Sequence, residues 1–253
     1  MSGGDGRQRR FASDPDAGPN HTGAPRVFIA VPLPEAARAD VAGLVESVRA
    51  AADPKARDVR WVRLDGLHLT LRFIGPVEEG AIVRLAGAVD TAAAAIKAFD
   101  VSVEGAGTFP AHGRPRAIWL GIDQGASELG QAAAAVDDAL ADIGIARNER
   151  PYRAHLTVAR ADGVRAGADV ARRLIDAAAG WRTAFAAGEL VLFESIAGGG
   201  PARYEPLHAA SLADSSGLSG PRHPAAAAVL PSEPSAGVRT SVGARRKEQR
   251  PGT

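Results

Sequence analysis

The chain has 253 residues, a formal net charge of +1 at pH 7 and no cysteine. A net charge near zero gives no general attraction to nucleic acid or to an anionic membrane surface. The absence of cysteine excludes a disulfide framework, a thiolate metal site and a cysteine nucleophile, and it fits a reducing cytoplasm, where we expect the protein to act. No apolar run approaches the roughly 20 residues that a membrane helix needs, so we expect no membrane association.

Two terminal segments differ in composition from the middle of the chain. Residues 1–24 and 212–253 are rich in small and polar residues, with proline and arginine, and contain few large apolar side chains. Such segments bury too little apolar surface to offset the entropy of ordering. We therefore predict a disordered N-terminal extension over residues 1–24, one folded domain over residues 25–211 and a disordered C-terminal tail over residues 212–253.

Predicted strands and helices alternate along the domain. In order, the first part contains a strand (26–31), a helix (34–51), two strands (59–62 and 66–76), a helix (78–99) and two strands (101–107 and 116–122). The second part contains a helix (127–143), a strand (153–160), a helix (168–178) and two strands (190–195 and 202–207). The repetition predicts an α+β domain of two related lobes, each a sheet covered on its outer face by helices, with a cleft between the uncovered faces.

The same short pattern occurs in two of these strands. Each has a histidine, one apolar residue and a threonine: His68 and Thr70 in the first, His155 and Thr157 in the second. Because side chains on a strand alternate between faces, each pair shares one face. The opposite, core-facing positions are Leu67, Leu69, Leu71 and Phe73 in the first strand and Leu156 and Val158 in the second. If the strands lie side by side or face to face, two imidazoles and two hydroxyls converge, which suits acid–base chemistry at a phosphate.

Further side chains are candidates for the same site. Arg72 shares the predicted face of His68, and Arg153 that of His155; each either contacts a phosphate or lies in solvent at the rim of the cleft. Phe109, in a proline-rich loop, is a candidate surface for stacking a nucleobase. No third His, Asp or Glu lies at an obvious partner position on either strand. Since catalytic zinc needs three protein ligands, we expect no metal and no other cofactor.

The paired histidine strands resemble those of the two-histidine (2H) phosphoesterase superfamily. The flanking segments narrow the resemblance to the RNA 2′,3′-cyclic phosphodiesterases, also called 2′-5′ RNA ligase-like proteins. Together the resembling segments span about residues 25–210, and they are residues 26–34, 60–62, 67–75, 107–110, 114–121, 153–160 and 192–195, with Tyr204. The resemblance implies a bilobal, pseudo-symmetric fold with two antiparallel sheets lining the cleft. It also implies that His68 is the proton donor and His155 the proton acceptor.

We therefore expect a monomeric, metal-independent enzyme that hydrolyses 2′,3′-cyclic phosphate ends of RNA to 2′-phosphates, with Thr70 and Thr157 binding the phosphate. Joining of 2′-5′ ends is the reverse reaction, so weak ligase activity would be compatible with this function. Two alternatives stay open at this point. One is a phosphoesterase acting on a small cyclic nucleotide or an ADP-ribose cyclic phosphate. The other is a non-catalytic module whose histidines bind RNA ends.

Overall fold

A computed structural model of the chain describes residues 24–52, 59–161, 166–198 and 200–214. The predicted N-terminal extension and C-terminal tail fall almost entirely outside these residues. Leu212 and Ala213, which the expected boundary assigns to the tail, belong to the folded part: Leu212 is buried, and the Ala213 amide donates to the carbonyl of Ile96. None of the helices within the described ranges is long and apolar enough to span a bilayer.

The strands form two sheets, in which every pairing between strands is antiparallel. The first sheet has the order β3-β1-β8-β9, with β3 at His68–Pro76, β1 at Arg26–Pro32, β8 at Glu189–Ile196 and β9 at Arg203–Ser211. The second has the order β2-β6-β5-β4-β7, with β2 at Val59–Trp61, β6 at His155–Ala161, β5 at Ala117–Ile122, β4 at Phe99–Phe109 and β7 at Arg182–Ala187. The two predicted histidine strands are thus β3 and β6, one in each sheet.

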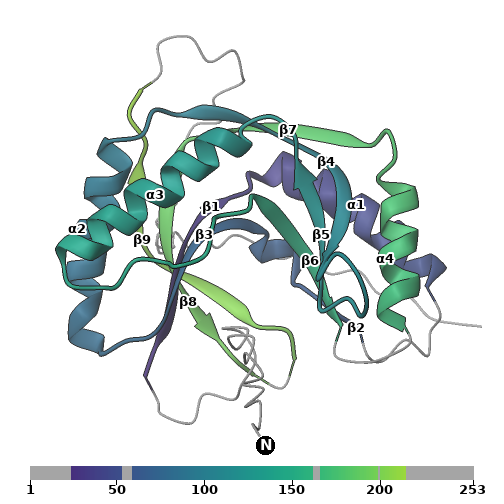
Figure 1. Cartoon of the computed structure of the whole chain (residues 1–253), viewed down its shortest axis with the longest axis horizontal. Coiled ribbons are helices and arrows are strands. Elements are labelled where there is room, and N and C mark those ends of the chain that lie inside the picture. The colour runs from purple at the N-terminus through teal and green to yellow at the C-terminus, as the bar shows by residue number, and fades with distance from the viewer. Residues whose placement is uncertain (1–23, 53–58, 162–165, 199, 215–253) are drawn as a thin grey trace, which may run out of the picture. The chain divides into compact units, whose positions relative to one another are not determined.

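Four α-helices cover the sheets: α1 (Glu35–Ala51), α2 (Ile82–Ala94), α3 (Ala126–Asp142) and α4 (Ala166–Ala177). Helices α2 and α3 pack together against the first sheet, whereas α1 and α4 pack against the second (Figure 1). In α1 the buried residues recur at helical spacing and are Ala37, Val41, Leu44, Val45 and Val48. This stripe buries one face of the helix against the sheet and leaves the opposite face to solvent. The predicted α+β arrangement of two helix-covered sheets is confirmed.

The two lobes are not the two halves of the sequence. Helix α1 follows β1 of the first sheet yet packs on the second, and α3 follows β5 of the second sheet yet packs on the first. Strand β4 likewise pairs with β5 and β7, while β8 pairs with β1 from the start of the domain. Each lobe therefore contains strands and helices from both parts of the chain. The repeated order of strands and helices in the sequence does not reveal that the two parts exchange elements between the lobes.

Two element assignments differ from the prediction. The helix expected over 78–99 is a short 3₁₀ turn (Glu79–Ala81) followed by α2, and Phe99 opens strand β4. The alanine-rich end of α2 has no glycine or proline to signal its stop, and alanine is the strongest helix former. Strand β7 was not predicted, because three of its six residues are alanines and it lacks the run of β-branched residues that marks a strand.

Candidate active site

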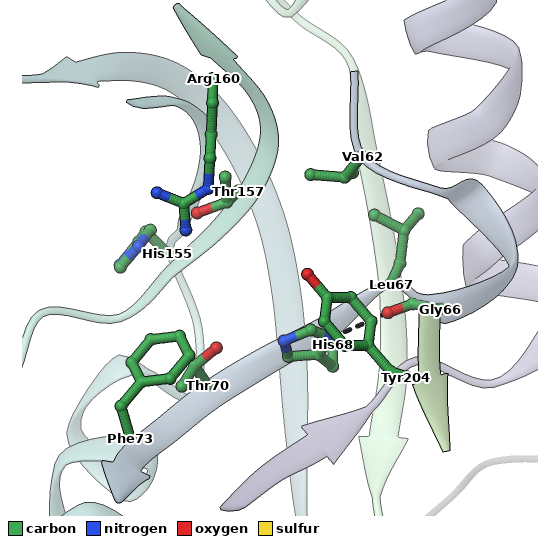
Figure 2. A pocket seen from close by; sticks show the side chains of 10 residues that line it. All are labelled: Val62, Gly66, Leu67, His68, Thr70, Phe73, His155, Thr157, Arg160 and Tyr204. Atoms are coloured by element: carbon green, nitrogen blue, oxygen red, sulfur yellow. Dashed lines mark hydrogen bonds between the residues drawn. The ribbon is translucent and has the colours of Figure 1, made fainter. Parts of the chain in front are cut away.

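Strands β3 and β6 contribute their histidines and threonines to one pocket between the two sheets. The pocket, called the catalytic pocket below, is lined by ten residues: Val62, Gly66, Leu67, His68, Thr70, Phe73, His155, Thr157, Arg160 and Tyr204 (Figure 2). The leucine and valine residues next to the histidines and threonines, such as Leu69 and Leu156, are fully buried behind them. The structure therefore brings together the four side chains that the two sequence patterns singled out.

A β-bulge follows each threonine and reverses the alternation of faces. In β3, Thr70 pairs with Ala30 and Arg72 pairs with Ile29, the adjacent residue of β1, so Leu71 is the extra residue. In β6, Thr157 pairs with Trp119 and Ala159 pairs with Ile118, which makes Val158 the extra residue. A bulge adds one residue to one strand and shifts the phase of its side chains by one position.

The bulges place Phe73 and Arg160, each five residues after its histidine, on the pocket face. The prediction that Phe73 faces the core is therefore wrong. Arg160 was not predicted as a site residue, since strict alternation places it opposite Thr157. The signal that could have identified it is the pair of buried residues Val158 and Ala159, which interrupts the alternation of apolar and polar positions.

Arg72 does not share the face of His68. Its guanidinium lies on the other side of the sheet, where Nε is 3.3 Å from a carboxylate oxygen of Asp137 in α3 and Nη2 donates to the carbonyl of Ala146 at 2.5 Å. The ion pair is largely shielded, with 12% and 19% of the two side chains exposed. The bulge at Leu71 accounts for this orientation, and the ion pair of Arg72 with Asp137 ties β3 to α3.

Both imidazole rings are held by the same backbone hydrogen bond. Nδ1 of His68 lies 2.7 Å from the carbonyl oxygen of Gly66, and Nδ1 of His155 lies 2.8 Å from that of Arg153. A carbonyl oxygen can only accept, so Nδ1 carries the hydrogen in both rings. Proton exchange with a substrate therefore falls to Nε2, which accepts a proton when the ring is neutral and donates one when it is charged.

Aromatic side chains surround both imidazoles. The His68 ring packs against Phe28, Phe193 and Tyr204, with centroid distances of 4.7, 5.9 and 4.9 Å. The His155 ring forms T-shaped contacts with Phe109 and Trp119, with centroid distances of 4.9 and 6.3 Å. These rings, with the carbonyl bonds, restrict each imidazole to one orientation.

The electrostatic surroundings of His155 favour its neutral form. Burial lowers the pKa of His155 most, and the nearby Arg160 guanidinium lowers it further, while the hydrogen bond to the Arg153 carbonyl opposes both effects. Figure 2 shows the Arg160 guanidinium beside His155 and the Thr157 hydroxyl. A neutral imidazole at physiological pH is the form that can accept a proton.

Tyr204, on β9 at the opposite edge of the first sheet from β3, lines the same pocket. Its ring stands edge-on to His68 and to Phe28, and Figure 2 shows its hydroxyl directed into the catalytic pocket. The sequence placed Tyr204 among the resembling residues without assigning it a role. Since two strands, β1 and β8, lie between β3 and β9 in the sheet, only the tertiary structure reveals this contact.

The remaining predicted contacts lie at the edge of the site. Arg153 is exposed and does not line the catalytic pocket; its backbone carbonyl contacts His155, but no contact of its guanidinium with the site is seen. Phe109 is half-buried and packs between Trp119 and His155, so it supports the imidazole. No group of three or more His, Cys, Asp or Glu side chains within the described ranges could hold a metal ion.

Comparison with known proteins identifies the family. The model of the 2′-5′ RNA ligase superfamily matches residues 33–198. A protein of Escherichia coli (strain K12) named RNA 2′,3′-cyclic phosphodiesterase is 30% identical over 185 residues, which cover 72% of this chain and 93% of that protein. One of the same name from Methanothermobacter thermautotrophicus is 33% identical over 140 residues, covering 55% of this chain and 73% of that protein.

A solved structure shows the same similarity in three dimensions. The crystal structure of E. coli LigT complexed with 3′-AMP aligns with a TM-score of 0.55 at 28% identity, covering 75% of this chain and 98% of that one. The resemblance inferred from the paired histidine strands is therefore confirmed. The family match and the extent of the E. coli relative show that this chain belongs to the 2′-5′ RNA ligase superfamily.

Proposed function

We propose that this chain hydrolyses the 2′,3′-cyclic phosphate at the end of an RNA to a 2′-phosphate, with His155 as general base and His68 as general acid. The observation that carries the proposal is the pair of imidazoles, one from each sheet, that line one pocket with Nδ1 bonded to the backbone. The activity named for the E. coli and M. thermautotrophicus relatives supports the choice of substrate.

The reaction requires two proton transfers. Neutral His155 takes a proton from water at Nε2 as the water oxygen attacks phosphorus opposite the 3′ oxygen. Charged His68 gives its Nε2 proton to the departing 3′ oxygen, so the products are a 2′-phosphate and a 3′-hydroxyl. Each transfer by a positioned side chain contributes typically ~10²–10⁴-fold to the rate. The lowered pKa of His155 supports its assignment as the base.

Three other side chains stabilise the phosphate in this scheme. The Thr70 and Thr157 hydroxyls donate to the non-bridging oxygens, which gain negative charge in the transition state. The Arg160 guanidinium lies on the same side as Thr157 and offsets that charge. The imidazolium, the hydroxyls and the guanidinium together supply the electrostatic role of a metal, so we expect the reaction to proceed without one.

The test is hydrolysis of a 2′,3′-cyclic phosphate oligoribonucleotide in EDTA, with the product ends compared with 2′- and 3′-phosphate standards. We expect the wild type to form 2′-phosphate ends and His68→Asn or His155→Asn each to lose about 10²–10⁴-fold in kcat. His208→Asn is the matched control: His208 pairs with Asp90 outside the catalytic pocket, and its activity should stay at the wild-type level.

Other outcomes would select a different function. Activity that EDTA removes and a divalent cation restores would show metal dependence. Turnover of small cyclic nucleotides but of no RNA would favour the small-molecule alternative. If the wild type has no turnover and His155→Asn only weakens RNA-end binding, the protein is a binding module and the proposal is wrong.

A further inference from the structure

Three successive backbone carbonyls before β3 accept hydrogen bonds. The middle one, that of Gly66, accepts from Nδ1 of His68 at 2.7 Å, and Figure 2 draws this bond as a dashed line. On one side of it, the carbonyl of Asp65 accepts from Nη1 of Arg38 at 2.7 Å. On the other side, the carbonyl of Leu67 accepts at 3.2 Å from a backbone amide between β1 and α1. The carbonyl that holds the His68 imidazole therefore lies between two anchored neighbours.

The bond of Arg38 joins the two lobes. Arg38 belongs to α1, which packs on the second sheet and contacts α4 and β7. Asp65 belongs to the 3₁₀ turn Leu64–Gly66, which leads into β3 of the first sheet. A helix that covers the sheet of His155 thus contacts the turn that holds His68. Arg38 does not line the catalytic pocket, so any effect on the reaction there must pass through the backbone of this turn.

The peptide unit between Asp65 and Gly66 is held at both ends. Its carbonyl accepts from Arg38, and its N–H donates to the carbonyl of Arg63 at 3.3 Å. The Arg63 guanidinium also donates to both carboxylate oxygens of Asp65, at 3.1 and 2.5 Å. Because each peptide unit is planar and only two bonds per residue rotate freely, fixing one unit restricts the direction of the next carbonyl. Here the next carbonyl is the acceptor for His68.

The place of Arg38 in its helix supports a role outside that helix. Arg38 is the fourth residue of α1 (Glu35–Ala51) and lies near the positive end of the helix dipole, where a cation is not favoured. Its side chain is nevertheless half-buried, and its guanidinium has the Asp65 carbonyl as an acceptor. The contact with the turn, rather than the stability of α1, explains an arginine at this position.

We propose that Arg38 is a positioning residue for His68. Its bond to the Asp65 carbonyl keeps the Gly66 carbonyl at Nδ1 of the imidazole, so that Nε2 is directed at the substrate. This inference rests on the proposed function in one respect, because it takes His68 as the proton donor. Without the bond, the Gly66 carbonyl can turn away, and the neutral ring no longer has an acceptor that keeps its hydrogen on Nδ1.

The first test reads the position of the hydrogen on each imidazole by nitrogen NMR of the full chain labelled with ¹⁵N-histidine. The His68 signals are identified by their loss in His68→Asn. In Arg38→Gln the fraction of neutral His68 that carries its hydrogen on Nε2 should rise at least about twofold. His155 is the internal control, because its acceptor is the Arg153 carbonyl in another segment, and its signals should stay unchanged. Arg84→Gln, at an exposed arginine of α2 outside the catalytic pocket, should change neither ring.

Kinetics on a 2′,3′-cyclic phosphate oligoribonucleotide give the second readout. Arg38→Gln should lower kcat about three- to tenfold and leave KM unchanged, because the proton donor is misdirected while the groups that bind phosphate stay in place. Arg38→Lys keeps a donor with a shorter reach and should show a smaller change in both readouts; it also serves if Arg38→Gln does not fold.

The two readouts separate the inference from the proposed function. Unchanged His68 signals in the Arg38 variants, or an equal change at His155, would overturn the inference while turnover by the wild type left the proposed function intact. Absence of turnover in the wild type would overturn the proposed function, and the NMR comparison would still decide whether Arg38 orients the His68 ring.

Discussion

The two histidine strands have the same local geometry and different chemistry. In both β3 and β6, a threonine follows the histidine by two residues, a bulge follows the threonine, and Nδ1 bonds the carbonyl two residues before the histidine. Five residues after the histidine, however, β3 has Phe73 and β6 has Arg160. A repeated backbone places the two imidazoles alike, and a single change of side chain gives the two sides of the pocket different charge.

The bulges explain why this difference matters. Without them, Arg72 and Ala159 would face the pocket, and the cation would lie on the side of His68. With them, the cation lies beside His155 and lowers its pKa, while Arg72 is held by Asp137 on the other face. The proposed assignment of His155 as base and His68 as acid thus depends on one extra residue in each strand.

After the loss of either histidine, removing the cation beside His155 has the largest expected effect. Arg160→Gln should lower kcat/KM for a cyclic phosphate substrate about 10–100-fold, because a hydrogen bond to a charged group contributes about 1.5–3 kcal/mol. Steady-state kinetics on the purified variant would measure the loss. Arg153→Gln is the control: Arg153 lies two residues before His155, and its side chain does not line the catalytic pocket. An equal loss of kcat/KM in Arg160→Gln and Arg153→Gln would contradict a specific role for the Arg160 guanidinium.

Arg72, the arginine of β3, should affect the stability of the fold and not the rate of catalysis. Arg72→Met leaves Asp137 without its partner in a shielded site, and we expect the free energy of unfolding to fall by about 2 kcal/mol. Urea unfolding followed by circular dichroism would measure the change. Arg72→Met combined with Asp137→Leu should recover part of it, because the second change removes the unpaired charge. A large loss of kcat well below the unfolding transition would contradict this role.

The pH dependence should report the environment of His155. Its lowered pKa predicts that kcat/KM falls on acidification with a midpoint below the ordinary imidazole value of about 6.5. In Arg160→Gln one cause of the lowering is gone, so the midpoint should move to higher pH. A pH–rate profile of each protein on the same substrate would show the shift. A midpoint that moves downward or stays in place would mean that Arg160 does not act on His155.

The smallest effect should come from a substitution of Gly66, which lies against the ring of Tyr204. A Cβ atom at Gly66 would lie 3.0 Å from Cδ2 of Tyr204, so the ring must move by a few tenths of an ångström. Because Tyr204 packs edge-on against His68, Gly66→Ala should lower kcat about two- to threefold. Gly43→Ala, on α1 with open space around its Cβ, is the control and should keep the wild-type kcat.

Much of the site could be predicted from local patterns. His68, Thr70, His155 and Thr157 each occupy a strand position whose apolar neighbours are buried, and period-two alternation is sufficient to place them. The positions after the threonines could not be predicted in this way, because a bulge depends on pairing with a distant strand, β1 or β5, and changes the alternation locally.

The way in which the chain crosses between the two lobes could not be predicted from local sequence patterns either. Helix α1 packs on the second sheet although its preceding strand belongs to the first. Its apolar stripe predicts that one face is buried but does not specify which sheet covers it. The contact of Tyr204 with His68 has the same origin, since it needs the order of four strands in the first sheet.

The exchange of strands between the lobes has one more consequence. A cut in the loop between β4 and β5 would leave an N-terminal fragment in which β2 and β4 have no strand to pair with, and a C-terminal fragment in which β7 is alone. Neither fragment could build a lobe by itself, so His68 and His155 can come together in one pocket only when both parts of the polypeptide fold around each other.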